Sequence, residues 1–266
     1  MLNPMLRAPA LGASLSAILA LSGHAVAIAQ PTSASPTDPA VGIFQPGSGA
    51  VPAPWSVIQL DKKVAPTRYK LEVWDGVPAI RADAKASMAL MARPVTVDLQ
   101  ATPVLCWRWR IGGVLKSADL ATKQGDDYAA RVYVAFKLPD SAISFGTGIK
   151  LGLARAIYGD QVPDAAVNYV WDNTHPVGTR APNAYTDRAQ TVVQQSGDQK
   201  AGQWVNERAN VLKDVTQAFG SKEARITLLA VASDTDNTGE TAEAGFADLH
   251  FVAPDAPCAT QKNARP

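Results

Sequence analysis

The stretch LCWRWRIGGVLKSADLATKQGDDYAARVYVAF, residues 105–136, decides the fold because it holds two strongly alternating runs joined by a polar connection. Side chains of a strand point alternately to its two faces, so each run has one apolar face and one polar face. In the first run the apolar face is Leu105, Trp107, Trp109 and Ile111, and the other face is Cys106, Arg108 and Arg110. In the second run the apolar residues Ala130, Val132, Val134 and Phe136 oppose Arg131 and Tyr133. We expect the two runs to pair in one sheet with a shared polar face.

The composition is that of a globular protein. The 266 residues are 47% hydrophobic and 18% charged, which is enough to bury a sizeable core. The 25 basic and 24 acidic residues nearly cancel, and no run of Lys or Arg forms a basic stripe. The sequence therefore argues against a nucleic-acid partner.

The N-terminus has the layout of a secretory signal peptide. Arg7 supplies the positive charge, an apolar stretch follows it, and Ala27-Ile28-Ala29 offers small residues for cleavage. We expect residues 1–29 to be removed, so that the protein is periplasmic or secreted. No later segment is long enough to span a bilayer, so the mature chain is expected to lack a membrane span.

The rest of the chain divides into three parts. Residues 30–54 are rich in Pro, Ser, Thr, Ala and Gly, and they predict a flexible linker. Residues 55–253 are expected to form a single domain, and residues 254–266 a tail.

Many short runs of β character, with turn residues between them, fill the expected domain. Asp75-Gly76 indicates a hairpin turn, whereas only residues 149–158 and 211–219 suit short helices. Asn210 and Gly220 are the expected caps of the second helix. This pattern predicts an all-β fold, an antiparallel β-sandwich of jelly-roll type similar to carbohydrate-binding modules, with one or two short helices.

Four motifs carry a resemblance to a known family. They are residues 103–109 (PVLCWRW), 125–136 (GDDYAARVYVAF), 169–171 (YVW) and 234–239 (DTDNTG). With them the chain resembles an uncharacterised family of exported bacterial proteins, domain of unknown function 3047, over nearly the whole expected domain. The resemblance implies an exported globular domain and brings no catalytic assignment.

The two cysteines, Cys106 and Cys258, can form one disulfide bond, which would tie the tail to the sheet. An even count in an exported chain favours this bridge. Two free thiols, with Cys106 acting as a small buried apolar residue, are the alternative.

The polar face of residues 105–136 is the expected ligand-binding surface. Guanidinium groups and a flat aromatic ring suit ligands rich in hydroxyl or carboxylate groups, which favours acidic envelope glycans over neutral ones. The predicted ligand-binding residues are Arg108, Arg110, Arg131, Tyr133 and Trp171. The alternative is structural: Arg131 pairs with Asp126 or Asp127, and helices or loops cover the face.

Catalysis would need two carboxyl groups facing each other across a cleft. The candidate acid and base groups are Asp126, Asp127 and the distant Glu207. The sequence leaves the separation of these groups open, and we expect no catalysis.

Residues 234–239 begin like a calcium loop, with acidic groups at the first and third positions and Gly239 at the sixth. The twelfth position is Gly245, where an EF-hand requires a carboxylate, so an EF-hand is excluded. Two interpretations stay open: a calcium site built from Asp234, Asp236 and Asp248, or an Asx-rich turn without any cofactor.

The sequence thus favours an exported, non-catalytic β-sandwich protein that binds a glycan or another cell-envelope polymer. A carbohydrate-active hydrolase or lyase on the same fold is the second hypothesis. A structural envelope protein with only protein partners is the third. Neither the ligand nor the oligomeric state follows from the sequence.

Overall fold

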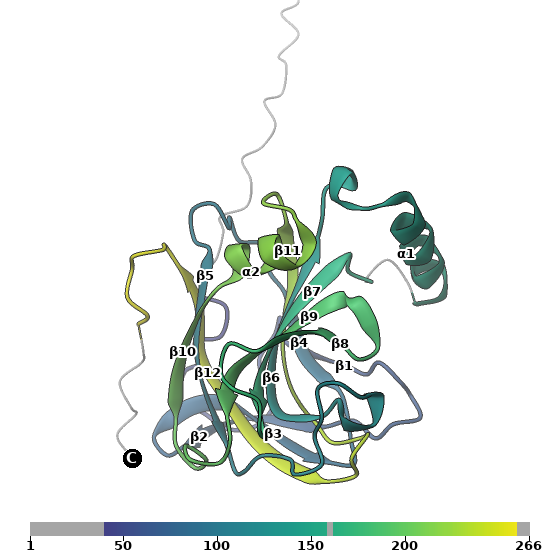
Figure 1. The fold of residues 1–266 in the computed structure, drawn as a ribbon. Helices are drawn as coiled ribbons and strands as arrows, with labels where there is room; N and C mark the ends of the chain where they lie inside the picture. Colours follow the sequence, from purple (N-terminus) through teal and green to yellow (C-terminus); the bar gives the residue numbers. More distant parts are fainter. Residues whose placement is uncertain (1–39, 159–161, 260–266) are drawn as a thin grey trace, which may run out of the picture. The chain divides into compact units, whose positions relative to one another are not determined.

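The computed structural model describes residues 40–158 and 162–259. Two β-sheets pack face to face around one core (Figure 1). Every strand pair is antiparallel except β7 with β9. The fold is therefore the expected β-sandwich of jelly-roll type. The signal peptide expected over residues 1–29 lies outside the described residues.

The smaller sheet has five strands in the order β10-β5-β12-β3-β2. Their bounds are β2 (Arg68–Trp74), β3 (Val77–Lys85), β5 (Val104–Ile111), β10 (Val205–Asn210) and β12 (Thr241–Val252). The strand β12 lies in the middle of this sheet, hydrogen-bonded to β3 on one side and β5 on the other.

The larger sheet has seven strands in the order β1-β4-β11-β6-β7-β9-β8. Their bounds are β1 (Ser56–Ile58), β4 (Leu90–Pro94), β6 (Tyr128–Lys137), β7 (Ala165–Asp172), β8 (Arg180–Asn183), β9 (Thr186–Ser196) and β11 (Arg225–Asp234).

The two alternating runs of residues 105–136 form β5 and β6, but they lie in different sheets. The prediction that they pair and share one polar face is therefore wrong. Alternation sets which residues of a strand share a face, but it does not set which strand is the neighbour. The apolar faces meet in the core, where Trp107 packs on Tyr169 at 5.4 Å and Trp109 on Trp171 at 5.7 Å between ring centroids. The polar faces consequently point outward on opposite sides of the sandwich.

Two α-helices accompany the sheets, α1 (Phe145–Tyr158) and α2 (Val211–Phe219). The helix α1 begins four residues before the expected range, whereas α2 has the expected bounds. The Asn210 side chain caps α2 by accepting from the backbone of Lys213, and Gly220 ends it with a φ of 73°. Short 3-10 helices occur at Lys123–Gly125 and Asp140–Ala142. Within the described ranges, none of the helices has the length and apolar character needed to cross a membrane.

The segment Ala40–Pro54 differs from the expected flexible linker. Val41 and Phe44 are buried in the main core, and the Gly42 amide donates to Leu249 O at 2.8 Å. Two apolar side chains within a Pro- and Gly-rich stretch are enough to hold it on the sandwich.

The tail is attached to the five-stranded sheet through a disulfide bond between Cys106 of β5 and Cys258. Hydrogen bonds hold the same segment: Arg208 donates to Ala256 O at 2.6 Å and also to Pro254 O, and Ala259 N donates to His250 Nε2 at 3.1 Å. The structure therefore contains the bridge and not the alternative pair of free thiols.

Candidate functional site

The outer face of the five-stranded sheet carries two tryptophans that sequence analysis did not single out. Trp74 ends β2 and Trp204 directly precedes β10, and both side chains are half-buried. Their ring centroids are 6.3 Å apart with an interplanar angle of 78°, and Trp204 Nε1 donates to Trp74 O at 3.1 Å. We call these two residues, with Arg81, Arg108 and Arg110, the tryptophan patch.

The sheet beneath the tryptophan patch is built from very small residues. A Cβ atom on Gly245 of β12 would lie 2.7 Å from the Trp204 ring and 3.1 Å from the Trp74 ring. Only glycine allows both indoles to approach the backbone this closely. Val77, Ala79 and Ala247 complete the buried apolar support under Trp204.

Three arginines lie over the indole rings. The guanidinium carbons of Arg81 and Arg110 are 4.5 and 4.7 Å from the centroid of Trp74, and that of Arg108 is 5.9 Å from Trp204. These distances are within the range of cation–π attraction, which holds charged donors beside the aromatic surface.

Each of these arginines also has a carboxylate partner. Arg108 Nε lies 2.6 Å from Asp248 Oδ2, and Arg110 pairs with Asp75. Arg81 contacts three carboxylates, Glu72 at 2.9 Å, Asp83 at 3.1 Å and Glu243 at 2.8 Å. Partial burial opposes the ionisation of Glu72, but Lys70 and Arg81 outweigh it and hold the pKa of Glu72 below its usual value. The patch therefore presents hydrogen-bond donors and acceptors together.

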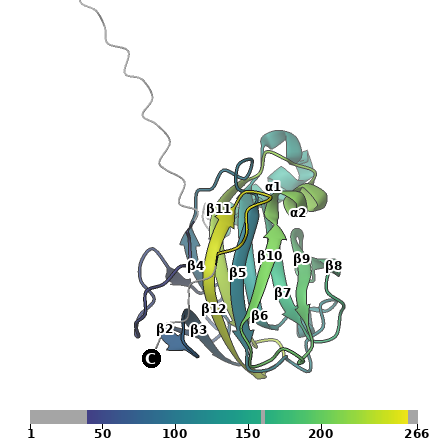
Figure 2. The ribbon, with the colours of Figure 1, turned by 90° about the vertical axis from the view of Figure 1, so that its left-hand side faces the viewer.

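No helix of the described ranges lies in front of this face. Figure 2 looks onto it, with β12, β5 and β10 nearest the viewer and both helices beyond the upper ends of the strands. The tryptophan patch is thus a half-buried pair of indoles with guanidinium groups close to the rings and carboxylates around them, a mixed aromatic and polar composition that also occurs in ligand-binding sites.

The outer face of the seven-stranded sheet is different. Here Arg131 is 2% exposed and donates from Nε to Asp234 Oδ1 at 2.7 Å and from Nη1 to Tyr133 Oη at 2.8 Å. Its Nη2 lies 3.4 Å from Asp126 Oδ1. We call Asp126, Asp127, Arg131, Tyr133, Asp234 and Asp236 the Arg131 cluster.

Loops seal the Arg131 cluster. Asn183, the last residue of β8, donates to Asp126 Oδ2 at 2.8 Å, and the backbone amides of Asn237 and Thr238 donate to Asp127 at 3.0 and 2.6 Å. Tyr185 joins these loops by donating to Asn237 Oδ1 at 2.7 Å. The Arg131 cluster is therefore a largely buried structural network: Arg131 is enclosed and Tyr133 is half-buried with its hydroxyl group bonded to Arg131, whereas the sequence had suggested an exposed face.

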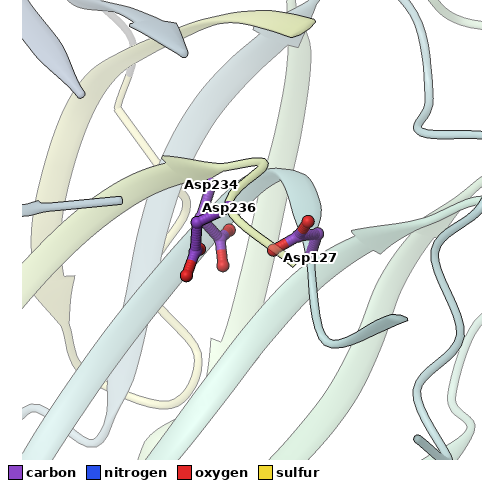
Figure 3. Close-up of side chains that lie close together, drawn as sticks. All are labelled: Asp127, Asp234 and Asp236. Carbon is purple, nitrogen blue, oxygen red and sulfur yellow. The ribbon is translucent and has the colours of Figure 1, made fainter. Parts of the chain in front are cut away.

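Three carboxylates of the Arg131 cluster lie together. One oxygen from each of Asp127, Asp234 and Asp236 lies within 4.8 Å of the others, which is compatible with oxygen ligands of a hard cation (Figure 3). Asp248, expected to join Asp234 and Asp236, instead pairs with Arg108 on the other sheet. Asp127 takes its place because the turn after β11 folds back onto the start of β6.

The charges in the Arg131 cluster are unbalanced. Four carboxylates surround a single guanidinium group, and Asp234 is fully buried. Burial first, and then the negative charges of Asp127 and Asp126, raise the pKa of Asp234 to about 8 against the opposing effect of Arg131. Burial and Asp127 also raise the pKa of Asp236.

The remaining predicted residues lie elsewhere. Trp171 is 1% exposed, packs on Trp109 in the core, and donates from Nε1 to Gly197 O at 3.0 Å. It therefore supports the fold and does not line an open site. Of the five predicted ligand-binding residues, only Arg108 and Arg110 lie in the tryptophan patch.

Glu207 is separated from the other two catalytic candidates. Glu207 is a buried residue of β10 and lies opposite Trp107 of β5. It accepts a hydrogen bond from Trp109 Nε1 at 3.1 Å, and burial raises the pKa of its carboxyl group. Asp126 and Asp127 have other partners, in the sealed Arg131 cluster on the seven-stranded sheet. The structure does not bring the three carboxylates to one cleft.

The fold and these two faces define a jelly-roll β-sandwich protein with one polar cluster covered by loops and one half-buried aromatic patch. The chain belongs to the family "Protein of unknown function (DUF3047)", whose model matches residues 53–250. No curated protein matches the sequence.

Several solved structures are similar in chain path. The family 12 xyloglucanase from Bacillus licheniformis has 8% identity and a TM-score of 0.43, covering 78% of this chain and 100% of that one. A thermostable cellulase derived from Cel12A of Rhodothermus marinus has 10% identity and a TM-score of 0.40, covering 77% and 99%. The xyloglucanase domain of NopAA from Sinorhizobium fredii has 9% identity and a TM-score of 0.34, covering 78% and 98%. At these identities no residue role can be carried to this chain.

Proposed function

We propose that this protein is a non-catalytic glycan-binding protein and that the tryptophan patch holds its ligand. One observation carries the proposal: two half-buried indoles, Trp74 and Trp204, lie side by side on a sheet face that neither described helix covers. An indole presents a large, rigid apolar surface at low cost in conformational entropy, and the C–H faces of a sugar ring can pack on it.

The polar frame of the patch supports the same proposal. Sugar hydroxyl groups both donate and accept hydrogen bonds, and the patch offers partners for both roles. Arg110 and Arg81 supply donors beside Trp74, while Asp75 and Glu243 supply exposed acceptors.

The carboxylates favour a binder over a hydrolase or lyase. Glycoside hydrolysis requires two carboxyl groups about 5 to 10 Å apart across the bond to be cleaved. Glu207 lies in the core beside Trp109, whereas Asp126 and Asp127 are held in the sealed Arg131 cluster. Among the described residues, these candidates do not form an open facing pair.

The proposal also includes export, which rests only on the sequence of residues 1–29. A mature chain that begins at Gln30 would meet glycans in the periplasm or outside the cell. Intact-mass analysis of protein recovered from those compartments tests this part of the proposal.

Binding to a panel of soluble polysaccharides, measured by affinity electrophoresis and calorimetry, tests the function. We expect Trp204→Ala or Trp74→Ala to weaken binding by about 30-fold, because a central aromatic contact contributes about 2 kcal/mol or more. The matched control is Phe145→Ala, which removes an 87% exposed aromatic side chain from α1, outside the patch.

Circular dichroism and the thermal midpoint confirm that each variant is folded. Failure of the wild type to bind any polysaccharide would refute the proposal and favour a protein with only protein partners. Equal binding by wild type and Trp204→Ala would refute the assignment of the patch.

A further inference from the structure

The charges around the tryptophan patch nearly balance, with one more carboxylate than cationic groups. Its surroundings hold four cationic groups and five carboxylates, joined in ion pairs: Lys70, Arg81, Arg108 and Arg110 with Glu72, Asp75, Asp83, Asp248 and Glu243. An anionic ligand that approaches a guanidinium group would compete with the carboxylate already paired with it. It would also bring its own negative charge close to the others, which is unfavourable.

An uncharged polyhydroxylated ligand meets no such obstacle. A hydroxyl group can donate to Asp75 or Glu243 and accept from an arginine without breaking the pair between them. The exposed position of these two carboxylates makes this arrangement accessible, since Asp75 has 59% and Glu243 51% of its side chain exposed.

The orientation of the indoles restricts the ligand further. The planes of Trp74 and Trp204 are 78° apart, so the two rings cannot both lie flat against one planar surface. A flexible single chain can pack one sugar on a ring and turn at the next, whereas the flat face of a crystalline polysaccharide cannot.

We infer that the tryptophan patch selects single chains of an uncharged glycan and rejects polyanionic and crystalline ones. This inference rests on the proposed function and corrects the expectation that acidic envelope glycans are the better ligands. The arginines of the patch balance carboxylates and position hydroxyl groups; they do not attract anions.

The test compares three probes with the full-length mature protein. They are hydroxyethyl cellulose as a soluble neutral chain, polygalacturonate as a polyanion, and microcrystalline cellulose as a flat solid. We expect binding to the neutral chain to change less than about twofold between about 20 and about 200 mM NaCl, because exposed charges contribute little to it. Polygalacturonate should not bind at either salt concentration, and the protein should not sediment with the solid.

A variant that removes one carboxylate of the patch tests the role of charge directly. Asp75→Asn removes the partner of Arg110 and keeps a side chain that tolerates the φ of 48° at this turn. We expect it to bind polygalacturonate measurably at low salt, where the wild type does not bind. The control, Glu223→Gln, makes the same change in net charge at an exposed position after α2 and should leave binding unchanged.

The outcomes separate the two proposals. Lack of binding to every probe refutes the proposed function itself. Salt-sensitive binding of wild type to polygalacturonate, or sedimentation with microcrystalline cellulose, overturns the selectivity inferred here and leaves glycan binding intact. Identical behaviour of Asp75→Asn and Glu223→Gln overturns the role of charge balance.

Discussion

An arginine pairs with an aspartate on the outer face of each sheet, but one pair is buried and the other is partly exposed to solvent. On the seven-stranded sheet, loops close over Arg131 and Asp234, which are both buried. On the five-stranded sheet, Arg110 pairs with an exposed Asp75 beside Trp74. The comparison shows that covering loops, and not residue type, decide whether such an ion pair is enclosed in the fold or keeps one partner exposed to solvent.

The largest expected difference in stability is between variants of Arg131 and Arg110. Arg131→Ala leaves buried carboxylates without their partner and should lower the free energy of unfolding by about 3 to 5 kcal/mol. Arg110→Ala breaks a half-exposed pair and should cost less than about 1 kcal/mol. Urea denaturation of both variants measures the contrast, and similar losses for the two would contradict it.

The disulfide bond lies on the outer face of the five-stranded sheet, but we expect its loss to affect stability more than ligand binding. The double variant Cys106→Ser, Cys258→Ser frees the tail and should lower the free energy of unfolding by about 2 to 5 kcal/mol, because the bridge closes a long loop. Affinity for hydroxyethyl cellulose should stay unchanged, since the hydrogen bonds and ring contacts found for Trp74 and Trp204 among the described residues do not include Cys106 or Cys258. Unchanged stability would show that the hydrogen bonds of Arg208 hold the tail by themselves.

The last expected effect is a loss of stability between pH 7 and 9 that comes from the Arg131 cluster. The pKa of Asp234 is raised to about 8 in the folded state, above its ordinary value, so the folded protein holds a proton that the unfolded chain releases. Stability is then lost as the pH rises from the ordinary pKa of an aspartate, about 4, to about 8, and the last part of this loss, about 1 kcal/mol, falls between pH 7 and 9. Denaturation of the wild type and of Asp234→Asn over this range measures it. The variant should lack this decline, and a flat wild-type profile would be evidence against the raised pKa.

Much of the fold could be predicted from local sequence patterns. The alternation in residues 105–111 and 128–136 indicated strands and their apolar faces, and Asn210 and Gly220 marked both ends of α2. These features depend on neighbouring residues along the chain, which a single sequence contains. Strand neighbours depend on distant pairing, so the sequence did not reveal that β5 and β6 belong to opposite sheets.

The candidate site depended even more on distant contacts. Trp74 and Trp204 are 130 residues apart, and only the sheet order brings their rings together. Their positions next to the turns at Asp75-Gly76 and Gly202 were the available signal, because tryptophans beside turns are often only partly buried. The loops that seal Arg131 likewise come from three separate parts of the chain.

The place of β12 in the five-stranded sheet has a consequence for the order of assembly. Residues Thr241–Val252 are the last strand of the chain, yet they join β3 to β5 in the middle of the sheet. Until they emerge from the ribosome, the pairs β2-β3 and β10-β5 have no hydrogen bonds between them in this sheet. The five-stranded sheet therefore cannot be completed before β12 has been synthesised, and a chain that stops before β12 would present two unpaired strand edges to its neighbours.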